Sequence, residues 1–302
     1  MKNLIRSLAF AALFAFAGDA AAVLRVVTTI PDLADITREI GGKLVDVESI
    51  ATGVEDPHAV PVKPSHVTKL NRADAVICIG LDNEHAYLPA LLEAGRNPRI
   101  LPGKTGYIDT SRGIAPLEVP KTLSKSEGDV HPAGNPHYNL DPVLGRTIVR
   151  NICDGLCRCD AKNESAYCAG RDAYLAKLDA KIAEWQKLAA PLKGVKFVSY
   201  HNHWAYFSER YGMTYEGTIE LRHGVEPTAK HIIDLIAQMK ADQVKIVVRE
   251  PQFAEKTPNH VAAQTGAKVV KLAIMVGGVP EAKTYLDLID YNVRTLLKAV
   301  QN

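Results

Sequence analysis

The sequence predicts an α/β protein with two parallel-sheet domains joined by one long helix. Short β-branched runs alternate with segments of helical periodicity in both halves of the chain, which is typical of β-α units. The longest helical pattern, at residues 163–190, lies between the two halves. A chain of 302 residues also exceeds what a single hydrophobic core usually organises. We therefore expect an N-terminal domain at 23–162, a linking helix at 163–190 and a C-terminal domain at 191–302.

The first 22 residues have the features of a removable secretory signal peptide. Lys2 and Arg6 precede an apolar run at 7–17 that is too short to span a bilayer, and small residues at 20–22 suit signal peptidase. No cysteine lies near this junction to take a lipid. We expect a mature chain that begins near Val23 and is free in a periplasm-like compartment.

In the first half, strand and helix signals alternate up to about residue 101. Proline suits the first turn of a helix, so we expect helices that begin at Pro31 and Pro64. The stretch 102–136 is rich in Gly, Pro, Ser and charged residues, which favours a long surface loop. The strands that we predict in this half are residues 24–29, 45–51, 74–80 and 99–101.

The second half begins with the long helix and then repeats the alternation. Apolar residues three and four apart mark this helix, which Pro191 and Gly194 end. Further helices are expected near Trp204, Pro227, Glu255 and Glu281. The strands that we predict in this half are residues 195–200, 213–219, 244–249 and 268–272.

The composition is that of a globular protein with a small ligand. Apolar residues make up 47% of the chain and charged residues 23%, with a formal net charge of +2. Basic blocks and stripes of interleaved aromatic residues are missing from the sequence, which argues against nucleic acid and anionic membrane surfaces as partners.

Cysteines crowd one short stretch of the chain, where Cys153, Cys157, Cys159 and Cys168 occur. Secretion favours oxidation and the spacings lack a paired C-x-x-C, so a disulfide is favoured over a metal knuckle. Cys153 and Cys168 lie about equally far from a predicted turn between two antiparallel helices, and this pairing is our first choice. Other connectivities remain open. Cys78 is expected to be an inert residue of a buried strand.

Three histidines from distant segments each follow a predicted strand or open a helix: His58, His137 and His201. Ligands of parallel α/β sheets bind beyond the carboxyl ends of the strands, where His58 and His201 both lie. Neutral imidazole is the commonest side-chain ligand for zinc-type metals. The pattern predicts a buried metal site in the cleft between the two domains.

Over essentially the whole mature chain, the sequence resembles the cluster A-I substrate-binding proteins of zinc and manganese ABC importers. The resemblance implies two domains joined by a rigid helix, a metal between them and little domain closure on binding. It also implies that a membrane permease receives the metal. The matching pieces are Asp56-Pro57-His58 with Pro64-Ser65, Ala73-Asp74-Ala75-Val76 with Gly80-Leu81, Asn135-Pro136-His137 through Asp141-Pro142, His201 with Tyr206-Phe207 and Arg210-Tyr211-Gly212, Glu226-Pro227, Glu250-Pro251-Gln252-Phe253, Thr265-Gly266-Ala267, and Tyr285 with Tyr291-Asn292.

By this resemblance, His58, His137 and His201 are the metal ligands. Manganese-preferring relatives tend to carry a carboxylate at the third position, so histidine at 201 favours zinc. Many relatives supply an acidic fourth ligand after the strand at 268–272, but residues 273–278 contain none. We expect water as the fourth metal ligand, with Glu250 as the second choice and the thioether of Met275 as the third.

We do not expect the remaining histidines to be metal ligands of the buried site. A helix beginning at His201 would turn His203 away, so we expect a surface or supporting residue there. His131 lies in the loop where zinc-binding relatives often carry a histidine-rich tract, and serves at most for transient capture. We expect Asp141 and Glu226 either to orient ligand rings or to cap helices. Surface positions are expected for His66, His85, His223, His231 and His260.

The sequence therefore predicts a monomeric periplasmic protein that captures Zn(II) and delivers it to an ABC permease, with a periplasmic metallochaperone as a further possible partner. Manganese or iron is the alternative cargo. A secreted zinc hydrolase is the alternative from another class, because three histidines and a water also describe a catalytic zinc site. Against an enzyme stands the absence of H-E-x-x-H from the sequence.

Overall fold

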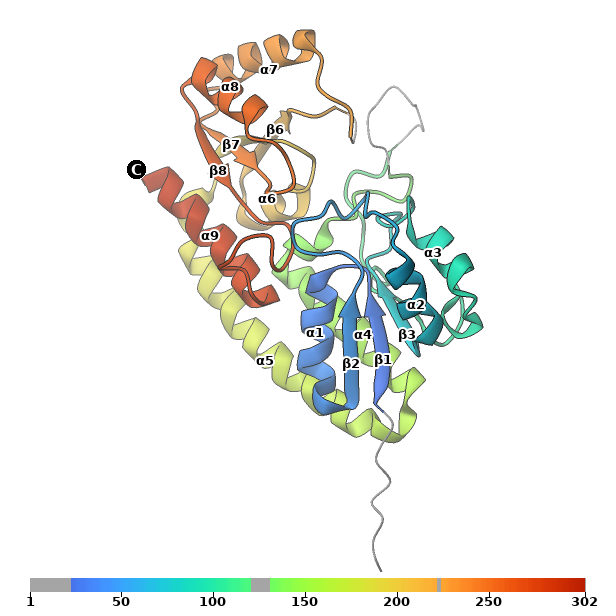
Figure 1. The fold of residues 1–302 in the computed structure, drawn as a ribbon. Coiled ribbons are helices and arrows are strands. Elements are labelled where there is room, and N and C mark those ends of the chain that lie inside the picture. Colours follow the sequence, from blue (N-terminus) through green and yellow to red (C-terminus); the bar gives the residue numbers. More distant parts are fainter. Residues whose placement is uncertain (1–22, 121–130, 222–223, 302) are drawn as a thin grey trace, which may run out of the picture.

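The computed structural model describes residues 23–120, 131–221 and 224–301, which fold into two α/β domains, one above the other in Figure 1. This arrangement confirms the predicted fold class. The signal peptide predicted at 1–22 lies outside the described residues. Among the helices that are described, none is long and apolar enough to cross a membrane.

Each domain is built on a four-stranded parallel sheet, and the two sheets have the same strand order. The first runs β2-β1-β3-β4 and the second β6-β5-β7-β8, so the first strand of each sheet lies inside it. Connections leave the strands on both sides of that inner strand, which opens a crevice at the carboxyl edge of each sheet. The strands are β1 (Leu24–Thr28), β2 (Val45–Ser49), β3 (Ala75–Cys78), β4 (Tyr107–Asp109), β5 (Lys196–Ser199), β6 (Thr214–Thr218), β7 (Ile246–Arg249) and β8 (Lys268–Lys271).

Helices cover the sheets, and one of them connects the domains. α5 (Glu164–Leu188) packs on α1 and α4 of the N-terminal domain and on α9 of the C-terminal domain (Figure 1). Near its end, the fully buried Trp185 donates a hydrogen bond from Nε1 to Asp290 Oδ1 at 3.0 Å. The other helices are α1 (Pro31–Gly41), α2 (Pro64–Arg72), α3 (Leu88–Gly95), α4 (Pro142–Cys159), α6 (Ala205–Tyr211), α7 (Ala229–Ala241), α8 (Lys256–Thr265) and α9 (Tyr285–Gln301).

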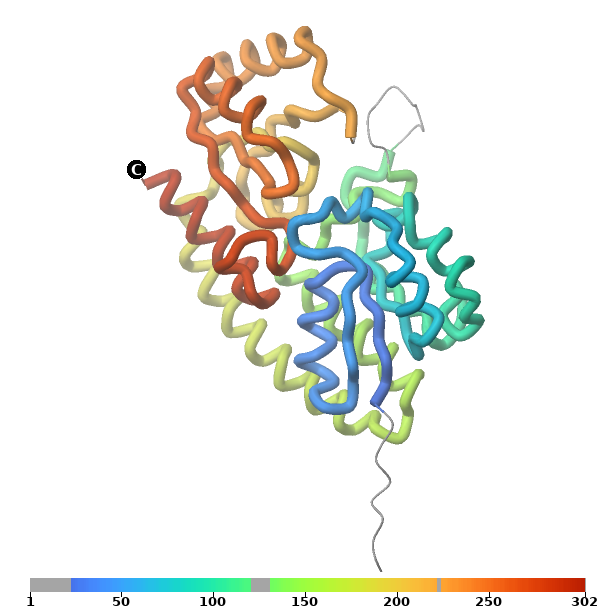
Figure 2. The backbone as a smooth tube through the Cα atoms, in the orientation of Figure 1, coloured from blue at the N-terminus to red at the C-terminus, as the bar shows by residue number. Residues whose placement is uncertain are grey.

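The domains also meet directly, where the loop after β2 contacts the loop after β8 (Figure 2). Gly53 approaches so closely that a Cβ there would lie 2.2 Å from the carbonyl carbon of Gly277. Asp32 of α1 accepts hydrogen bonds from Val276 N at 3.0 Å and from Asn139 Nδ2 at 3.2 Å. The segment after β8, in which no acidic ligand is present, is thus held by contacts between the domains.

The edge of the first sheet differs from the prediction. The strand expected at 99–101 is wrong, because Pro98–Ile100 is a 3-10 turn in which Asn97 Oδ1 accepts from Arg99 N at 3.2 Å. Proline lacks the N–H that a sheet ladder needs. The edge strand is instead β4, within the stretch predicted to be a loop, and it pairs in parallel with β3.

The predicted disulfide is absent from the described structure, in which all five cysteines are free thiols. Cys153, Cys157 and Cys168 do lie together at the turn between α4 and α5, with their sulfur atoms within 4.8 Å of one another. Cys153 and Cys168, the predicted pair, are both free thiols. A disulfide needs sulfur atoms about 2.05 Å apart, and the neighbouring pair Cys153 Sγ and Cys157 Sγ is also too far apart, at 4.0 Å. The sequence argument located the cluster but assigned it the wrong bond.

Candidate metal centre

Four buried histidines converge between the domains. His58 lies in the loop after β2, His137 just before α4, and His201 and His203 between β5 and α6. One ring nitrogen from each of the four lies within 4.8 Å of the other three. Each residue is at most 5% exposed. The structure therefore brings together the three histidines expected as ligands and adds a fourth.

The backbone after β5 explains why both His201 and His203 face the same point. His203 N donates to His201 O at 2.9 Å, and Ser199 Oγ donates to the same carbonyl at 2.6 Å, which fixes a tight turn around Asn202. α6 begins only at Ala205, so the helical geometry that would turn His203 away does not apply. The expectation that His203 points elsewhere is wrong. The turn thus brings both rings to one point, and the His-x-His spacing was the only signal of this in the sequence.

Acceptors behind three of the rings hold the Nε2 atoms toward the centre. His58 Nδ1 lies 3.3 Å from the carbonyl oxygen of Asn83, and His201 Nδ1 lies 3.1 Å from Glu220 Oε2. His203 Nδ1 lies 3.4 Å from Glu250 Oε1, which also accepts from Trp204 Nε1 at 2.7 Å. Such an acceptor fixes the proton on Nδ1 and leaves the Nε2 lone pair for a metal.

The spacing of the nitrogens suits a tetrahedral ion. Zinc–nitrogen bonds of about 2.0–2.1 Å place two ligands of one tetrahedral zinc about 3.3 Å apart. His58 Nε2 and His137 Nε2 are 3.1 Å apart. A small inward movement of His201 and His203 would complete four-coordination from imidazoles alone.

The surroundings of His137 favour the neutral form of its ring. Burial holds the pKa of His137 well below its usual range, and the neighbouring rings of His203, His58 and His201 lower it further. Neutral imidazole is the form that binds metals, so the fold keeps this ligand ready for an ion.

The other candidates for the fourth ligand lie behind or outside the ring of nitrogens. Glu250 follows β7 and is fully buried behind His203, where burial raises the pKa of its carboxyl to about 8. Met275 packs in the hydrophobic core. Neither belongs to the convergent ligand set, which contains four histidines and no carboxylate among the described residues.

The sequence offered Asp141 and Glu226 either as ring partners or as helix caps, and the structure confirms the capping role for Asp141. Asp141 caps α4 by accepting from Val143 N at 2.8 Å, and it forms a two-bond ion pair with Arg210 of α6, each bond 2.8 Å. It therefore links the domains rather than a ligand ring. Glu226 lines a separate cavity with α7 and α8. Glu220 and Glu250 take the orienting positions, and sequence reasoning assigned neither to that role.

A cavity of about 530 Å³ leads from solvent to His137 and His201. Carboxylates line this cavity, among them Glu118 and Glu216, of which Glu216 also pairs with Lys196 at 3.6 Å. His131 also lines this entrance, with its ring centroid 5.0 Å from that of His58. The entrance thus combines negative charge with one further imidazole.

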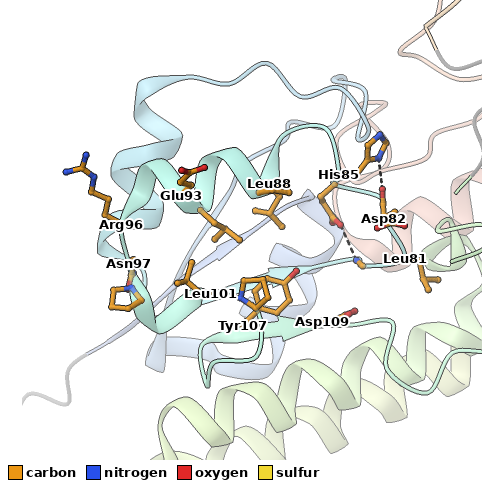
Figure 3. A pocket seen from close by; sticks show the side chains of 16 residues that line it. Leu81, Asp82, His85, Leu88, Glu93, Arg96, Asn97, Leu101, Tyr107 and Asp109 are labelled. Carbon is orange, nitrogen blue, oxygen red and sulfur yellow. Dashed lines mark hydrogen bonds between the residues drawn. The ribbon is translucent and has the colours of Figure 1, made fainter. Parts of the chain in front are cut away.

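A larger cavity, of about 730 Å³, lies elsewhere in the N-terminal domain between α3 and β4 (Figure 3). Its lining is mostly apolar and includes Leu88, Leu101 and Tyr107. His85 is the histidine in it, and its Nδ1 bonds the backbone oxygen of Asp82 at 2.8 Å. The larger cavity therefore lacks a convergent ligand set, and the metal centre belongs to the smaller one.

The remaining histidines mostly lie at or near the surface, with one exception. His85 and His260 are exposed and His231 is half-buried, while His223 lies outside the described residues. His66 is buried at 4% exposure on the inner side of α2, one turn before Leu70, so the surface position expected for it is wrong. Burial and the nearby Lys63 and Lys69 lower the pKa of its ring.

Two parallel-sheet domains, one connecting helix and a buried imidazole cluster between them define a metal-binding protein of the substrate-binding type. The sequence profile of the family described as zinc-uptake complex component A, periplasmic (ZnuA), matches residues 26–299. The chain belongs to this family, which consists of metal-binding proteins of ABC transporters and not of enzymes. The predicted family and the prediction of a non-enzyme are confirmed.

Individual relatives carry different metals in their names. The chain is 25% identical to the iron-binding protein YfeA of Yersinia pestis over 93% of this chain and 87% of the relative. It is 25% identical to the manganese ABC transporter lipoprotein PsaA of Streptococcus pneumoniae, over 92% and 89%. A solved ZnuA deletion mutant with zinc bound is 30% identical, with a TM-score of 0.77 over 92% of this chain and 98% of that chain. Metal binding is common to these relatives, but the ion differs.

Proposed function

We propose that this protein captures Zn(II) in the periplasm with His58, His137, His201 and His203, and that it delivers the ion to an ABC permease. The observation that carries the proposal is the buried four-imidazole cluster. Manganese and Fe(II) favour sites with oxygen ligands more than zinc does, and four nitrogens without a carboxylate favour zinc. The fourth imidazole takes the place of the water that we first expected.

The acidic entrance supports a role in capture. Glu118 and Glu216 lie where a hydrated cation would enter, and His131 offers it a nitrogen before the buried cluster. Because the ligands must be neutral, acid weakens binding as protons compete for the imidazoles. The family relationship supports handover to a membrane permease, and we expect the protein to act as a monomer.

Competition titration with a chelator tests the ligand assignment. His58→Ala, His137→Ala, His201→Ala and His203→Ala should each weaken zinc binding by at least about 100-fold, because each removes a bond to the ion. His260→Ala is the matched control, since its side chain is exposed on α8, and it should leave the affinity unchanged. Unchanged affinity in any of the four variants would remove that residue from the ligand set.

The identity of the ion needs a separate measurement. Elemental analysis of protein isolated from its own compartment should find one zinc per chain. Iron and manganese are the cargoes named for two relatives, and either metal at full occupancy would contradict the zinc assignment.

A further inference from the structure

We propose a second metal site, separate from the histidines, in which Cys153, Cys157 and Cys168 bind one soft monovalent cation such as Cu(I). The three sulfur atoms lie within 4.8 Å of one another at the turn between α4 and α5. This turn is at the end of the N-terminal domain away from the domain junction (Figure 1).

The helix pair places the three thiols around one point. Cys153 and Cys157 are four residues apart on α4, so their side chains lie on the same face, one turn from each other. Cys168 comes from the first turns of α5, which packs against α4 in the opposite direction. The three thiols are therefore already close together, and an ion could bind without a rearrangement of the backbone.

The distances fit coordination better than they fit a disulfide. With metal–sulfur bonds of about 2.3 Å, three thiolates in a plane around one ion stand about 4.0 Å apart. Cys153 Sγ and Cys157 Sγ are 4.0 Å apart. A disulfide would require this separation to fall to about 2.05 Å.

The donor set selects the kind of ion. Thiolate is a soft ligand that favours Cu(I) and zinc, but structural zinc is almost always four-coordinate. Among the described residues, the trio has no histidine or carboxylate to complete a tetrahedron. Three-coordination by sulfur suits a Cu(I)-type ion.

Burial and charge shape how the ion would be held. Cys153 is fully buried, whereas Cys157 and Cys168 are half-buried, so the cluster is reached from the outer side of the turn. Binding releases the three thiol protons and leaves two net negative charges on the site. The guanidinium of Arg171 pairs with Asp172 at 2.8 Å and also lies close enough to interact electrostatically with Cys153 and Cys168.

The test uses the full chain, reduced with a phosphine and kept free of oxygen, in a background in which His58, His137, His201 and His203 are all replaced by alanine, so that the imidazole site is removed. Cu(I) buffered by bicinchoninate is titrated while the ultraviolet thiolate-to-metal charge-transfer band is recorded. We expect one Cu(I) per chain with this band. Cys157→Ala, Cys168→Ala and Cys153→Ser should each abolish the uptake.

Cys159→Ser is the matched control, because Cys159 is a half-buried thiol of the same helix whose Sγ donates to Thr105 O instead. It should bind Cu(I) as the parent does. The two alanine variants remove half-buried side chains, and circular dichroism verifies that each variant is folded. Absence of uptake by the reduced parent would overturn the proposal, as would equal loss in Cys159→Ser, or a stoichiometric disulfide within the trio in protein isolated from its own compartment.

Discussion

At the scale of the residue, each ligand ring depends on the group behind it. Glu220 and Glu250 are buried carboxylates, and both follow strands of the second sheet that flank β5. They hold His201 and His203, whereas a backbone carbonyl holds His58. The rings of the C-terminal half of the cluster are therefore oriented by side-chain carboxyl groups and not by the backbone.

Replacing Glu220 with alanine should weaken zinc binding by about 10- to 100-fold, because the His201 ring loses the acceptor that fixes its orientation. Isothermal competition titration measures the change. Glu216→Ala serves as the control, since Glu216 lies in the same cavity but pairs with Lys196 at 3.6 Å. An equal effect from both variants would mean that entrance charge, and not ring orientation, is responsible.

Asp32 should make the protein less stable as the pH rises from about 4 to about 7. Burial raises the pKa of its carboxyl from 3.8 to about 7, so in this range the folded state binds a proton that the unfolded state has lost. The free energy of unfolding then falls with pH, by at most about 4 kcal/mol in total. Denaturant unfolding of the metal-free protein and of Asp32→Asn across this range isolates the effect. Parallel pH profiles for the two proteins would contradict it.

The candidate site was only partly accessible from the sequence. His58 and His201 could be selected because motif and strand-end position coincide there, and His137 because its motif opens a helix. His203 was rejected because the histidine segment was itself considered as the start of a helix, whereas α6 begins only at Ala205. A helix start is the least certain feature of a periodic pattern. Glu220 could not be selected at all, because its contact with His201 follows from the parallel pairing of β5 with β6.

At the scale of the element, α5 depends on close approach to α1. A Cβ on Gly170 would lie 2.2 Å from the carbonyl oxygen of Ile40, at the end of α1. The helix carries residues of high helical propensity, and its length was readable from the sequence. The need for glycine at position 170 could not be predicted from the sequence, because it arises from contact with a residue 130 positions earlier.

Gly170→Ala should destabilise the protein by about 1–3 kcal/mol through overpacking. Alanine has a higher helix propensity than glycine, so propensity alone predicts that the same substitution stabilises the protein by about 1 kcal/mol. Chemical unfolding of the metal-free protein decides between them. Ala183→Gly, at an exposed position of the same helix, measures the effect of helix propensity without any change in packing. It should lower the free energy of unfolding by about 1 kcal/mol.

At the scale of the whole molecule, the two domains are held by more than the connecting helix. Arg210 of α6 pairs with Asp141 at the start of α4. Gln252 Nε2 donates to Gly53 O at 2.8 Å, and Tyr206 OH donates to Asn135 O at 2.7 Å. Bonds on several sides of the metal centre would oppose a hinge motion, and the small domain closure that the family resemblance implies stays a prediction. The relative position of His58 and His201 is therefore set by the junction.

Gly53→Ala should weaken zinc binding because it inserts a methyl group where the domains touch. Its Cβ would lie 2.2 Å from the Gly277 carbonyl carbon and 2.3 Å from Val276 O, both of which are backbone atoms that cannot rotate away. Relief requires the loops to separate. Because His58 shares its loop with Gly53, it would then move relative to His201 and His203, and a misplacement of about 1 Å is large for bonds of about 2.0–2.1 Å.

Competition titration measures the loss of zinc affinity, and small-angle scattering measures any change in the relative position of the domains. Gly95→Ala is the control, since a Cβ there meets its nearest neighbour at 3.3 Å and within one domain. Parent-like zinc affinity in Gly53→Ala would show that the histidines reach the ion independently of the junction. Zinc affinity would then not depend on a fixed position of the two domains relative to each other.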